Sequence, residues 1–152
     1  MKRKEPGTVL TKETIDYGEF IGSYCKLMSA KTVVEVGVQL GDTTIELCKA
    51  VKITNGKVYG YDIFEPMPPG YPKLKPGQSK EEVEERLESL GFKDYFKITK
   101  TNTFHDEFDQ KLKEDLGKNR IDLAFIDGCH SYEGVLNDFK KIYSHLSYDG
   151  SI

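Results

Sequence analysis

Short apolar runs alternate along this chain with longer segments whose apolar residues recur at helical spacing. The runs are rich in valine, isoleucine, tyrosine and phenylalanine, which favours buried strands; they cover residues 32–37, 57–62, 95–99 and 121–127. Apolar residues three or four positions apart predict helices with one buried face; they cover about 12–29, 43–51, 79–90 and 104–112, and a last stripe runs from Val135 to Leu146. Thr43 with Glu46, and Ser79 with Glu82, have the spacing of capping boxes at two helix starts.

Strands that alternate with helices throughout predict an α/β fold. Parallel strands need crossover helices, which then cover both faces of the sheet. We therefore predict a Rossmann-like doubly wound parallel sheet in a single domain, residues 1–152. A loop at 65–78 holds five of the six prolines, and we interpret it as either a functional flap or a disordered insert.

The end of the chain leaves the predicted sheet open. Asp149–Ile152 have the pattern of a turn that enters a fifth strand, so strand 121–127 is expected to have a bare edge. Proteins normally cover such an edge. We consider two explanations. The chain is the N-terminal part of a longer fold whose C-terminal strands are missing, or a homodimer or another partner covers the edge.

Composition narrows the class of protein. The chain has 152 residues and a net charge of −3, with 38% hydrophobic and 31% charged residues. The charge disfavours a nucleic-acid partner, and no apolar run approaches the roughly 20 residues that cross a membrane. No signal peptide is recognisable after the basic start. The three cysteines form neither a disulfide frame nor a zinc motif, and we expect a cytoplasmic protein without a membrane partner.

Polar residues at the ends of the first two predicted strands indicate a ligand site. In open α/β sheets, ligands bind beyond the carboxyl ends of the strands. The first strand runs into Glu35-x-Gly37-x-x-x-Gly41, where glycines allow a ligand to approach the backbone. Asp62 ends the second strand about 20 residues after Gly41, which suits a ribose diol, although a solvated turn aspartate has the same pattern. Because Gln39 interrupts the GxGxxG fingerprint, a nicotinamide-dependent dehydrogenase is disfavoured.

An acid, a thiol and an imidazole follow the fourth predicted strand: Asp127, Cys129 and His130. This arrangement has four alternative interpretations. The first is a metal site with Asp127 as a ligand, the second is a general base, His130, and the third is a thiol nucleophile, Cys129. The fourth alternative is a plain turn in which Asp127 caps the next helix and His130 lies in its first turn. No matching triad accompanies Cys129, which we interpret as a small spacer. His105 and His145 are interpreted as surface residues.

Together, E-x-G-x-x-x-G, the acid that ends the second strand and the sequence FIDGCHSYEGVLNDF resemble class I S-adenosylmethionine-dependent methyltransferases. The resemblance is closest to methyltransferase family 24, and looser to the macrolide sugar O-methyltransferases. It implies that Glu35, Gly37, Val38, Gly41, Thr43 and Thr44 surround the methionine part of S-adenosylmethionine, that Asp62 holds the ribose, that Ile63 flanks the adenine, and that Asn102 and Thr103 lie at the adenine edge. Thr43 and Asn102 also suit plain helix caps.

The resemblance also implies an acceptor side at the end of the fourth strand. Asp127 would contact the cofactor and bind a divalent cation such as Mg²⁺, His130 would take the proton from a hydroxyl, and Tyr132 would flank the acceptor. Asp138 completes the resemblance, and we interpret it as a helix-surface charge. The implied function is O-methylation of a small-molecule acceptor, a sugar or another small polar metabolite. The alternative is a truncated, non-catalytic module that binds the cofactor or packs with a partner.

Overall fold

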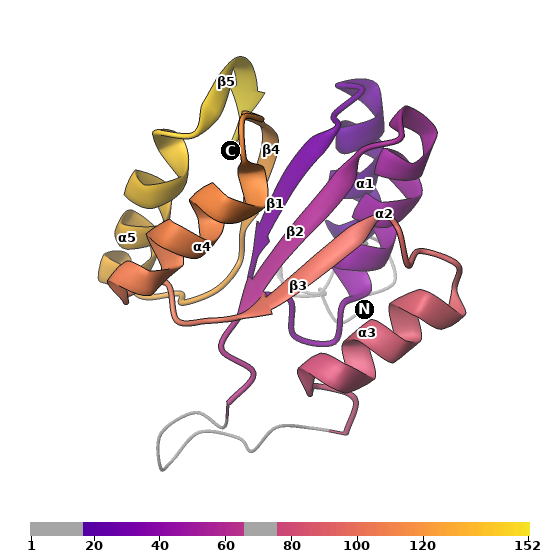
Figure 1. The fold of residues 1–152 in the computed structure, drawn as a ribbon, viewed down its shortest axis with the longest axis horizontal. Coiled ribbons are helices and arrows are strands. Elements are labelled where there is room, and N and C mark those ends of the chain that lie inside the picture. Colours follow the sequence, from indigo (N-terminus) through magenta and orange to yellow (C-terminus); the bar gives the residue numbers. More distant parts are fainter. Residues whose placement is uncertain (1–16, 66–75) are drawn as a thin grey trace, which may run out of the picture.

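A computed structural model of the chain describes residues 17–65 and 76–152. These residues form five strands and five helices (Figure 1). The strands are β1 (Thr32–Val36), β2 (Lys57–Asp62), β3 (Phe96–Lys100), β4 (Ile121–Ile126) and β5 (Leu146–Ser151). The helices are α1 (Tyr17–Leu27), α2 (Asp42–Thr54), α3 (Lys80–Ser89), α4 (Asp106–Leu116) and α5 (Tyr132–Tyr143). Most of the predicted loop at 65–78 and the predicted first turn of the first helix lie outside the described residues.

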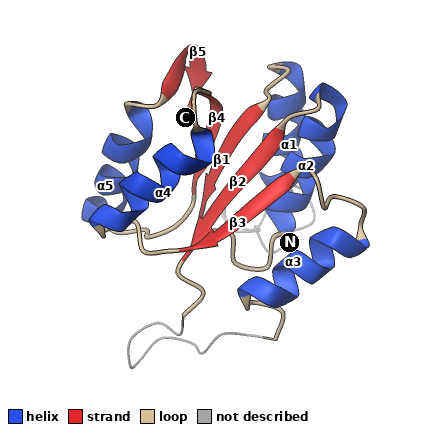
Figure 2. Cartoon of the chain, in the orientation of Figure 1, coloured by secondary structure: helices blue, strands red, loops and turns tan. Residues whose placement is uncertain are grey.

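All five described strands are parallel, in the order β3-β2-β1-β4-β5 (Figure 2). Helices α1, α2 and α3 cover one face of the sheet, and α4 and α5 cover the other (Figure 1). The chain builds β2 and β3 on one side of β1 and then crosses to place β4 on the other. Ligands bind at such a switch point in open α/β folds. The predicted doubly wound parallel sheet is confirmed.

The burial of the strand residues explains why the positions of the strands could be predicted from the sequence. Every residue of β1 is buried, so its sequence is a near-continuous apolar run, as parallel strands covered on both faces require. Strand β2 occupies the predicted residues, and the other three predicted strands agree within one residue at each end.

The two predicted capping boxes have opposite outcomes. At α3, Glu82 N–H donates to Ser79 Oγ at 3.2 Å and Ser79 N–H donates to Glu82 Oε2 at 3.1 Å, so that box is confirmed. The box of Thr43 and Glu46 at α2 is wrong. This helix begins one residue earlier, after a left-handed glycine that provides no side-chain cap, so Thr43 already lies inside the first turn.

The expectation that the fourth strand has a bare edge is also wrong. Helix α5 ends at Tyr143, and Leu146, predicted as the last member of its apolar stripe, begins β5. Strand β5 pairs with β4 through Ile121 opposite Leu146 and Leu123 opposite Ser151, with an irregular register between them. The open edge on this side of the sheet therefore belongs to β5.

Part of the apolar faces predicted for the first and last helices stays on the surface. The exposed members are Tyr17, Phe20, Tyr24 and Leu27 on α1, and Val135, Phe139 and Tyr143 on α5. An apolar groove of about 240 Å³ lies between α1 and the end of the sheet; its lining includes Phe20, Ile21, Tyr24, Phe125 and Ile152. We call it the α1–β5 groove. Both helices thus present apolar side chains to solvent.

The three cysteines are free, as predicted: Cys25 and Cys48 are buried and Cys129 is exposed. Within the described ranges, the structure contains no helix with the length and apolar character needed to cross a bilayer.

Candidate functional site

The loops that follow β1 and β4 touch at Gly37. A Cβ atom at this position would lie 2.3 Å from the carbonyl oxygen of Asp127, and Gly37 has a φ of 92°. Only glycine satisfies both constraints. Gly37 N–H donates to Tyr61 O at 2.9 Å, and Asp127 N–H donates to Val36 O at 2.8 Å. The carboxyl ends of β1, β2 and β4 are thereby held in one place.

Asp62 shapes the backbone of the loop after β1. Its Oδ2 atom accepts from the N–H groups of Val38 and Gln39, each at 2.9 Å, and its Oδ1 atom accepts from Phe64 N–H at 2.8 Å. Gln39 has a φ of 50°, a region that few residues other than glycine adopt. Asp62 is therefore not a merely solvated turn residue. A carboxylate has about four acceptor positions, and these three hydrogen bonds leave about one of them for a further donor.

Glu35 is buried beneath the same loop. Its side chain is 1% exposed, and the hydroxyl of Thr44 donates to Oε2 at 2.5 Å. Burial raises the pKa of Glu35 to about 8, against the lowering effect of the Thr44 hydrogen bond. The neighbouring charges of Asp62 and Asp127 contribute to this rise in pKa. The carboxyl is thus largely protonated at neutral pH. The Thr44 hydroxyl already donates its hydrogen to Glu35 within the protein.

The other residues predicted to bind the cofactor lie around this edge in different surroundings. Val38 is buried over Gly60, where a Cβ atom would lie 2.9 Å from Val38 Cγ2. Gly41 has a φ of 78° and packs against α3. Thr43 and Ile63 are both half-buried.

Asp127 and His130 form a hydrogen-bonded pair after β4. His130 Nε2 and Asp127 Oδ1 are 3.1 Å apart, and the two side chains are 75% and 51% exposed, so both are accessible from solvent. Cys129 lies between them, with its sulfur 3.3 Å from Ser131 Oγ. Ser131 is the N-cap of α5 and accepts from Gly134 N–H at 3.0 Å. The plain-turn alternative, in which Asp127 caps this helix, is therefore wrong.

The described side chains offer few ligands for a divalent cation at Asp127. Residues 17–65 and 76–152 contain no group of three His, Cys, Asp or Glu side chains placed to hold a metal ion. A hard cation such as Mg²⁺ takes about six oxygen ligands, and here a single carboxylate stands beside an imidazole. These side chains alone do not fit the predicted cation, and Asp127 as a metal ligand stays a prediction.

The segment that follows β3 is held by a hydrogen bond within its own turn and by a hydrogen bond from α5. Asn102 Oδ1 accepts from Phe104 N–H at 3.0 Å, which closes a local turn. The N-cap of α4 is His105, so the alternative interpretation of Asn102 as the helix cap is wrong. The carbonyl oxygen of Thr103 accepts from Asn137 Nδ2 at 3.1 Å. This link to α5 was not predicted.

The interpretation of Asp138 as a surface charge is wrong, because its side chain is 1% exposed. A signal for its burial was present in the sequence: Gly134, Asp138 and Ile142 recur at intervals of four and form the buried face of α5. Val135, Phe139 and Tyr143 of the predicted apolar stripe stay exposed, whereas Ile142 of the same stripe is buried. Because aspartate is almost never fully buried, a prediction from hydrophobicity alone did not identify Gly134 and Asp138 as part of the buried face of α5.

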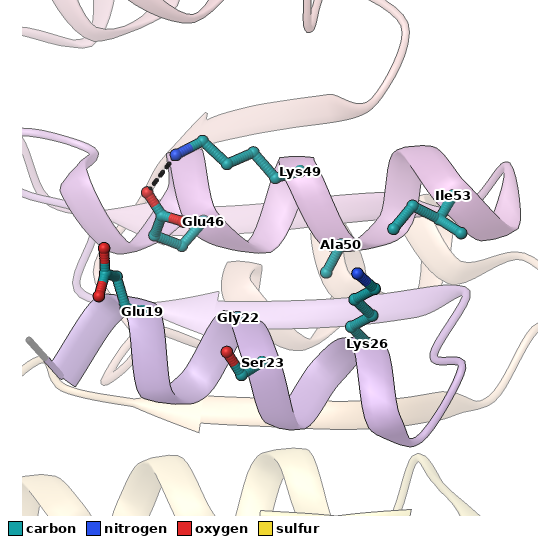
Figure 3. A pocket seen from close by; sticks show the side chains of 8 residues that line it. All are labelled: Glu19, Gly22, Ser23, Lys26, Glu46, Lys49, Ala50 and Ile53. Carbon is teal, nitrogen blue, oxygen red and sulfur yellow. Dashed lines mark hydrogen bonds and ion pairs between the residues drawn. The ribbon is translucent and has the colours of Figure 1, made fainter.

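A second, polar groove runs along the seam between α1 and α2 rather than at the strand ends (Figure 3). The helices approach closely at Gly22, where a Cβ atom would lie 2.9 Å from Glu46 Cβ. Glu46 also pairs with Lys49 across 2.6 Å on the groove wall. We interpret this groove as a helix-packing seam.

The strand order, the switch between β1 and β4 and the acids at the strand ends define an α/β domain of the class that binds ligands at the carboxyl edge of the sheet. The family model described as "Methyltransferase domain" (Methyltransf_24) matches residues 34–152. The chain belongs to this methyltransferase family, which confirms the resemblance drawn from the sequence motifs.

Solved structures of similar fold include three in complex with a cofactor or its product. TomG, an O-methyltransferase of tomaymycin synthesis from Streptomyces achromogenes in complex with SAM, has a TM-score of 0.67 and 15% identity. The O-methyltransferase from Bacillus cereus in complex with SAH has a TM-score of 0.65 and 15% identity. Cofactor-bound Rv0187 from MTB has a TM-score of 0.64 and 18% identity.

Each of these three matches covers 93% of this chain, and they cover 54%, 55% and 54% of the other chains, respectively. The chain therefore spans about half the length of these proteins. At such low identity, the likeness shows the fold alone. A comparison with curated proteins finds no match to this sequence.

Proposed function

We propose that this domain binds S-adenosylmethionine and transfers its methyl group to a hydroxyl of a small polar acceptor such as a sugar. The observation that carries the proposal is the contact at Gly37, which joins the loop shaped by Asp62 to the turn that holds Asp127 and His130. The proposed cofactor-binding loop and the proposed base thus follow two adjacent strands, β1 and β4. The cofactor-bound O-methyltransferases of the same fold support this assignment.

The residues that would hold the cofactor follow the carboxyl edge. Those around its methionine part are Glu35, Gly37, Val38, Gly41, Thr43, Thr44 and Asp127; Asp62 would accept from the ribose, Ile63 would flank the adenine, and Asn102 and Thr103 would lie at the adenine edge. Two positive-φ glycines and a loop ordered by a carboxylate suit a ligand that lies against the backbone. When bound, the cofactor supplies a methyl group that is activated for transfer by its sulfonium.

His130 is the proposed general base. An alcohol is a weak nucleophile until its proton is removed, and imidazole titrates near neutral pH. Asp127 accepts from the protonated Nε2 at 3.1 Å, so Nδ1 of the neutral ring is the atom that takes the proton. Asp127 also stabilises the imidazolium that results. The position of the acceptor oxygen relative to the methyl group accounts for the rest of the rate.

The binding half of the proposal is tested by calorimetric titration with S-adenosylhomocysteine. We expect Asp62→Ala to weaken binding by about 1–3 kcal/mol, because a carboxylate–hydroxyl bond and the order of the loop are lost together. Asp149→Ala is the control, since Asp149 is exposed on β5, away from the loop. Equal affinities for both variants would remove Asp62 from the site.

The catalytic half is tested by methyl transfer to a panel of sugar and other hydroxyl acceptors. His130→Ala should lower the rate by about 10²–10⁴-fold, while His105→Ala, a change to another exposed histidine, should leave it unchanged. Full activity of His130→Ala would contradict the base assignment. Binding of S-adenosylhomocysteine by the parent chain without transfer to any acceptor would favour a cofactor-binding module instead.

A further inference from the structure

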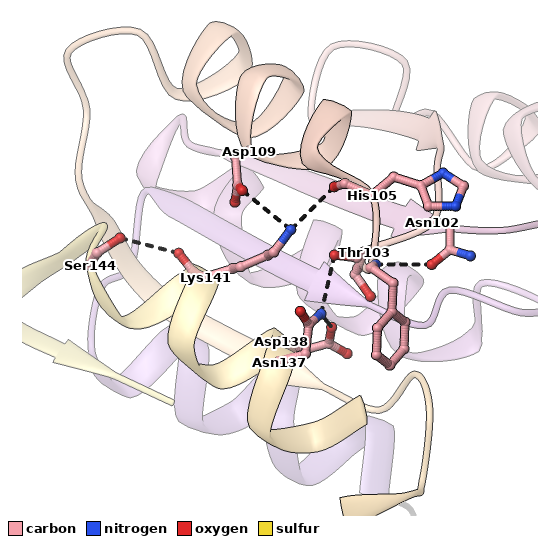
Figure 4. Close-up of polar contacts among 9 residues, drawn as sticks. Asn102, Thr103, His105, Asp109, Asn137, Asp138, Lys141 and Ser144 are labelled. Atoms are coloured by element: carbon pink, nitrogen blue, oxygen red, sulfur yellow. Dashed lines mark hydrogen bonds and ion pairs between the residues drawn. The ribbon is translucent and has the colours of Figure 1, made fainter. Parts of the chain in front are cut away.

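Two side chains of α5 connect the loop after β3 with the turn after β4. Asn137 Nδ2 donates to Thr103 O at 3.1 Å and to Asp138 Oδ1 at 3.0 Å (Figure 4). The amide nitrogen has two hydrogens and both partners are acceptors, so its donors are fully used and the orientation of the amide is determined. The two hydrogen bonds of Asn137 therefore link the loop at the proposed adenine edge to the carboxyl of Asp138.

Asp138 continues this connection to the turn that carries Asp127 and His130. A Cβ atom at Gly128 would lie 3.5 Å from Asp138 Oδ2 and 3.1 Å from Val36 Cγ1. The turn is thus packed between the end of β1 and helix α5. Among the described residues, Oδ2 of Asp138 is the only buried side-chain polar atom without a hydrogen bond.

A buried carboxylate oxygen without a donor is unfavourable, and folded proteins retain few such atoms. This one faces the backbone of Gly128, one residue after Asp127 and two before His130. Gly128 has no side chain to separate the turn from the oxygen. The backbone of the turn that holds Asp127 and His130 therefore lies directly against Oδ2.

We propose that Asn137 and Asp138 are positioning residues that couple the cofactor side of the site to His130. The inference rests on the proposed function, because it takes Thr103 as the adenine edge and His130 as the base. Occupation of the adenine edge holds the Thr103 segment, which keeps Asn137 and the Asp138 carboxyl in place. Oδ2 then accepts from the turn, and the turn sets the direction of His130. Neither positioning side chain touches the reacting atoms.

Lys141 provides a matched control on the same helix. Its Nζ atom donates to His105 O at 3.2 Å and pairs with Asp109 Oδ2 at 3.2 Å (Figure 4). Lys141 thus fastens the same loop to α5, but its contacts lead to α4 rather than to the turn after β4. If the loop only became less ordered, the response of His130 to the probe would change equally in the Lys141 and Asn137 variants. Coupling through Asp138 affects only the latter.

The test follows the ring resonances of His130 by NMR while S-adenosylhomocysteine is added to the 152-residue chain. In the parent, saturation with this probe shifts the ring resonances. Asn137→Ala and Asp138→Asn should still bind the probe, with a Kd raised no more than about tenfold, but the shift should be smaller, because only the direct effect of the probe through Asp127 remains. Lys141→Met should keep the full shift. Thermal unfolding checks that each variant is folded, and if Asn137→Ala is not, the isosteric Asp138→Asn decides.

A His130 response in the folded Asn137 and Asp138 variants equal to that of the parent would overturn the coupling. An equal reduction of the response in Lys141→Met would overturn it too, because the loop would then act without the carboxyl. If the parent chain does not bind the probe, the proposed function fails first and the coupling falls with it. The two failures are therefore distinguishable.

Discussion

Two acids are buried near the carboxyl edge of the sheet, and each is held by a side chain close to it in sequence. Glu35 accepts from the Thr44 hydroxyl, and Asp138 accepts from the Asn137 amide. Burial of a carboxyl in an apolar interior is unfavourable unless hydrogen bonds compensate. Apolar side chains would fill these two positions without that cost. The presence of two buried acids beside the loops that meet at Gly37 therefore supports a functional site at this edge of the sheet.

Glu35 makes the stability of the protein depend on pH in a predictable direction. Its folded-state pKa of about 8 lies above the ordinary value of 4.5, so the native protein binds more protons than the unfolded chain between these values. The stabilising contribution of the protonated carboxyl is complete below pH 4.5 and is lost as the pH rises through 8. We expect Glu35→Gln, which stays neutral, to match the parent at pH 5 and to exceed it at pH 9 by a few kcal/mol.

Urea unfolding of both proteins across this pH range measures the difference. Glu85→Gln, a change to an exposed acid of α3, should follow the parent at every pH. A constant difference between Glu35→Gln and the parent would mean that the carboxyl does not take up a proton on folding.

At the scale of single elements, the sequence predicted strands better than helix ends. Buried parallel strands have apolar residues on both faces, so their limits appear directly in the composition of the chain. The end of α5 was missed because Leu146 continues a helical spacing by coincidence while it begins β5. The start of α2 was missed because a left-handed glycine ends the loop, and a backbone conformation replaces the side-chain cap that Thr43 and Glu46 suggested.

Helix α3 supports the loop after β1 through one side chain. Arg86 donates to Leu40 O at 2.9 Å and to Asp42 Oδ1 at 2.8 Å. We expect Arg86→Met to weaken binding of S-adenosylhomocysteine about three- to tenfold, because the loop loses a charge-assisted hydrogen bond. The free energy of unfolding should fall by less than about 1 kcal/mol, because both partners of the ion pair are largely exposed.

Calorimetry and urea unfolding measure these two quantities. Lys93→Met serves as the control: its side chain is 74% exposed and lies 4.0 Å from Glu88. It should change neither affinity nor stability. If Arg86→Met binds as tightly as the control, the order of the loop does not depend on α3.

At the scale of the whole molecule, the place of the site could be predicted because parallel strands bring their carboxyl ends to one edge. Glu35, Asp62 and Asp127 follow from that rule alone. The way in which they are used could not be predicted, because it depends on contacts between distant segments. Asp62 is largely occupied by backbone N–H groups, and Asn137 links two loops from a helix that the apolar pattern had oriented differently.

The open edge of β5 and the α1–β5 groove predict that the chain associates with itself. An edge strand presents unpaired backbone groups to other chains, and Tyr148 on this strand is fully exposed. Phe20 adds an apolar side chain, 65% exposed, on the wall of the adjoining groove. We expect sedimentation velocity to show a weight-average mass that rises with protein concentration. A second copy that covers the edge would bury the groove as well.

Phe20→Asp tests this surface because it places a charge in the groove without removing a core contact. The variant should sediment as a monomer at concentrations where the parent is associated, since burial of an unpaired carboxylate opposes the contact. Leu27→Asp adds the same charge to the same helix at a side chain that is 81% exposed and outside the groove lining. It should associate like the parent. Equal dissociation of both variants would make net charge the cause, and equal association would place the contact elsewhere.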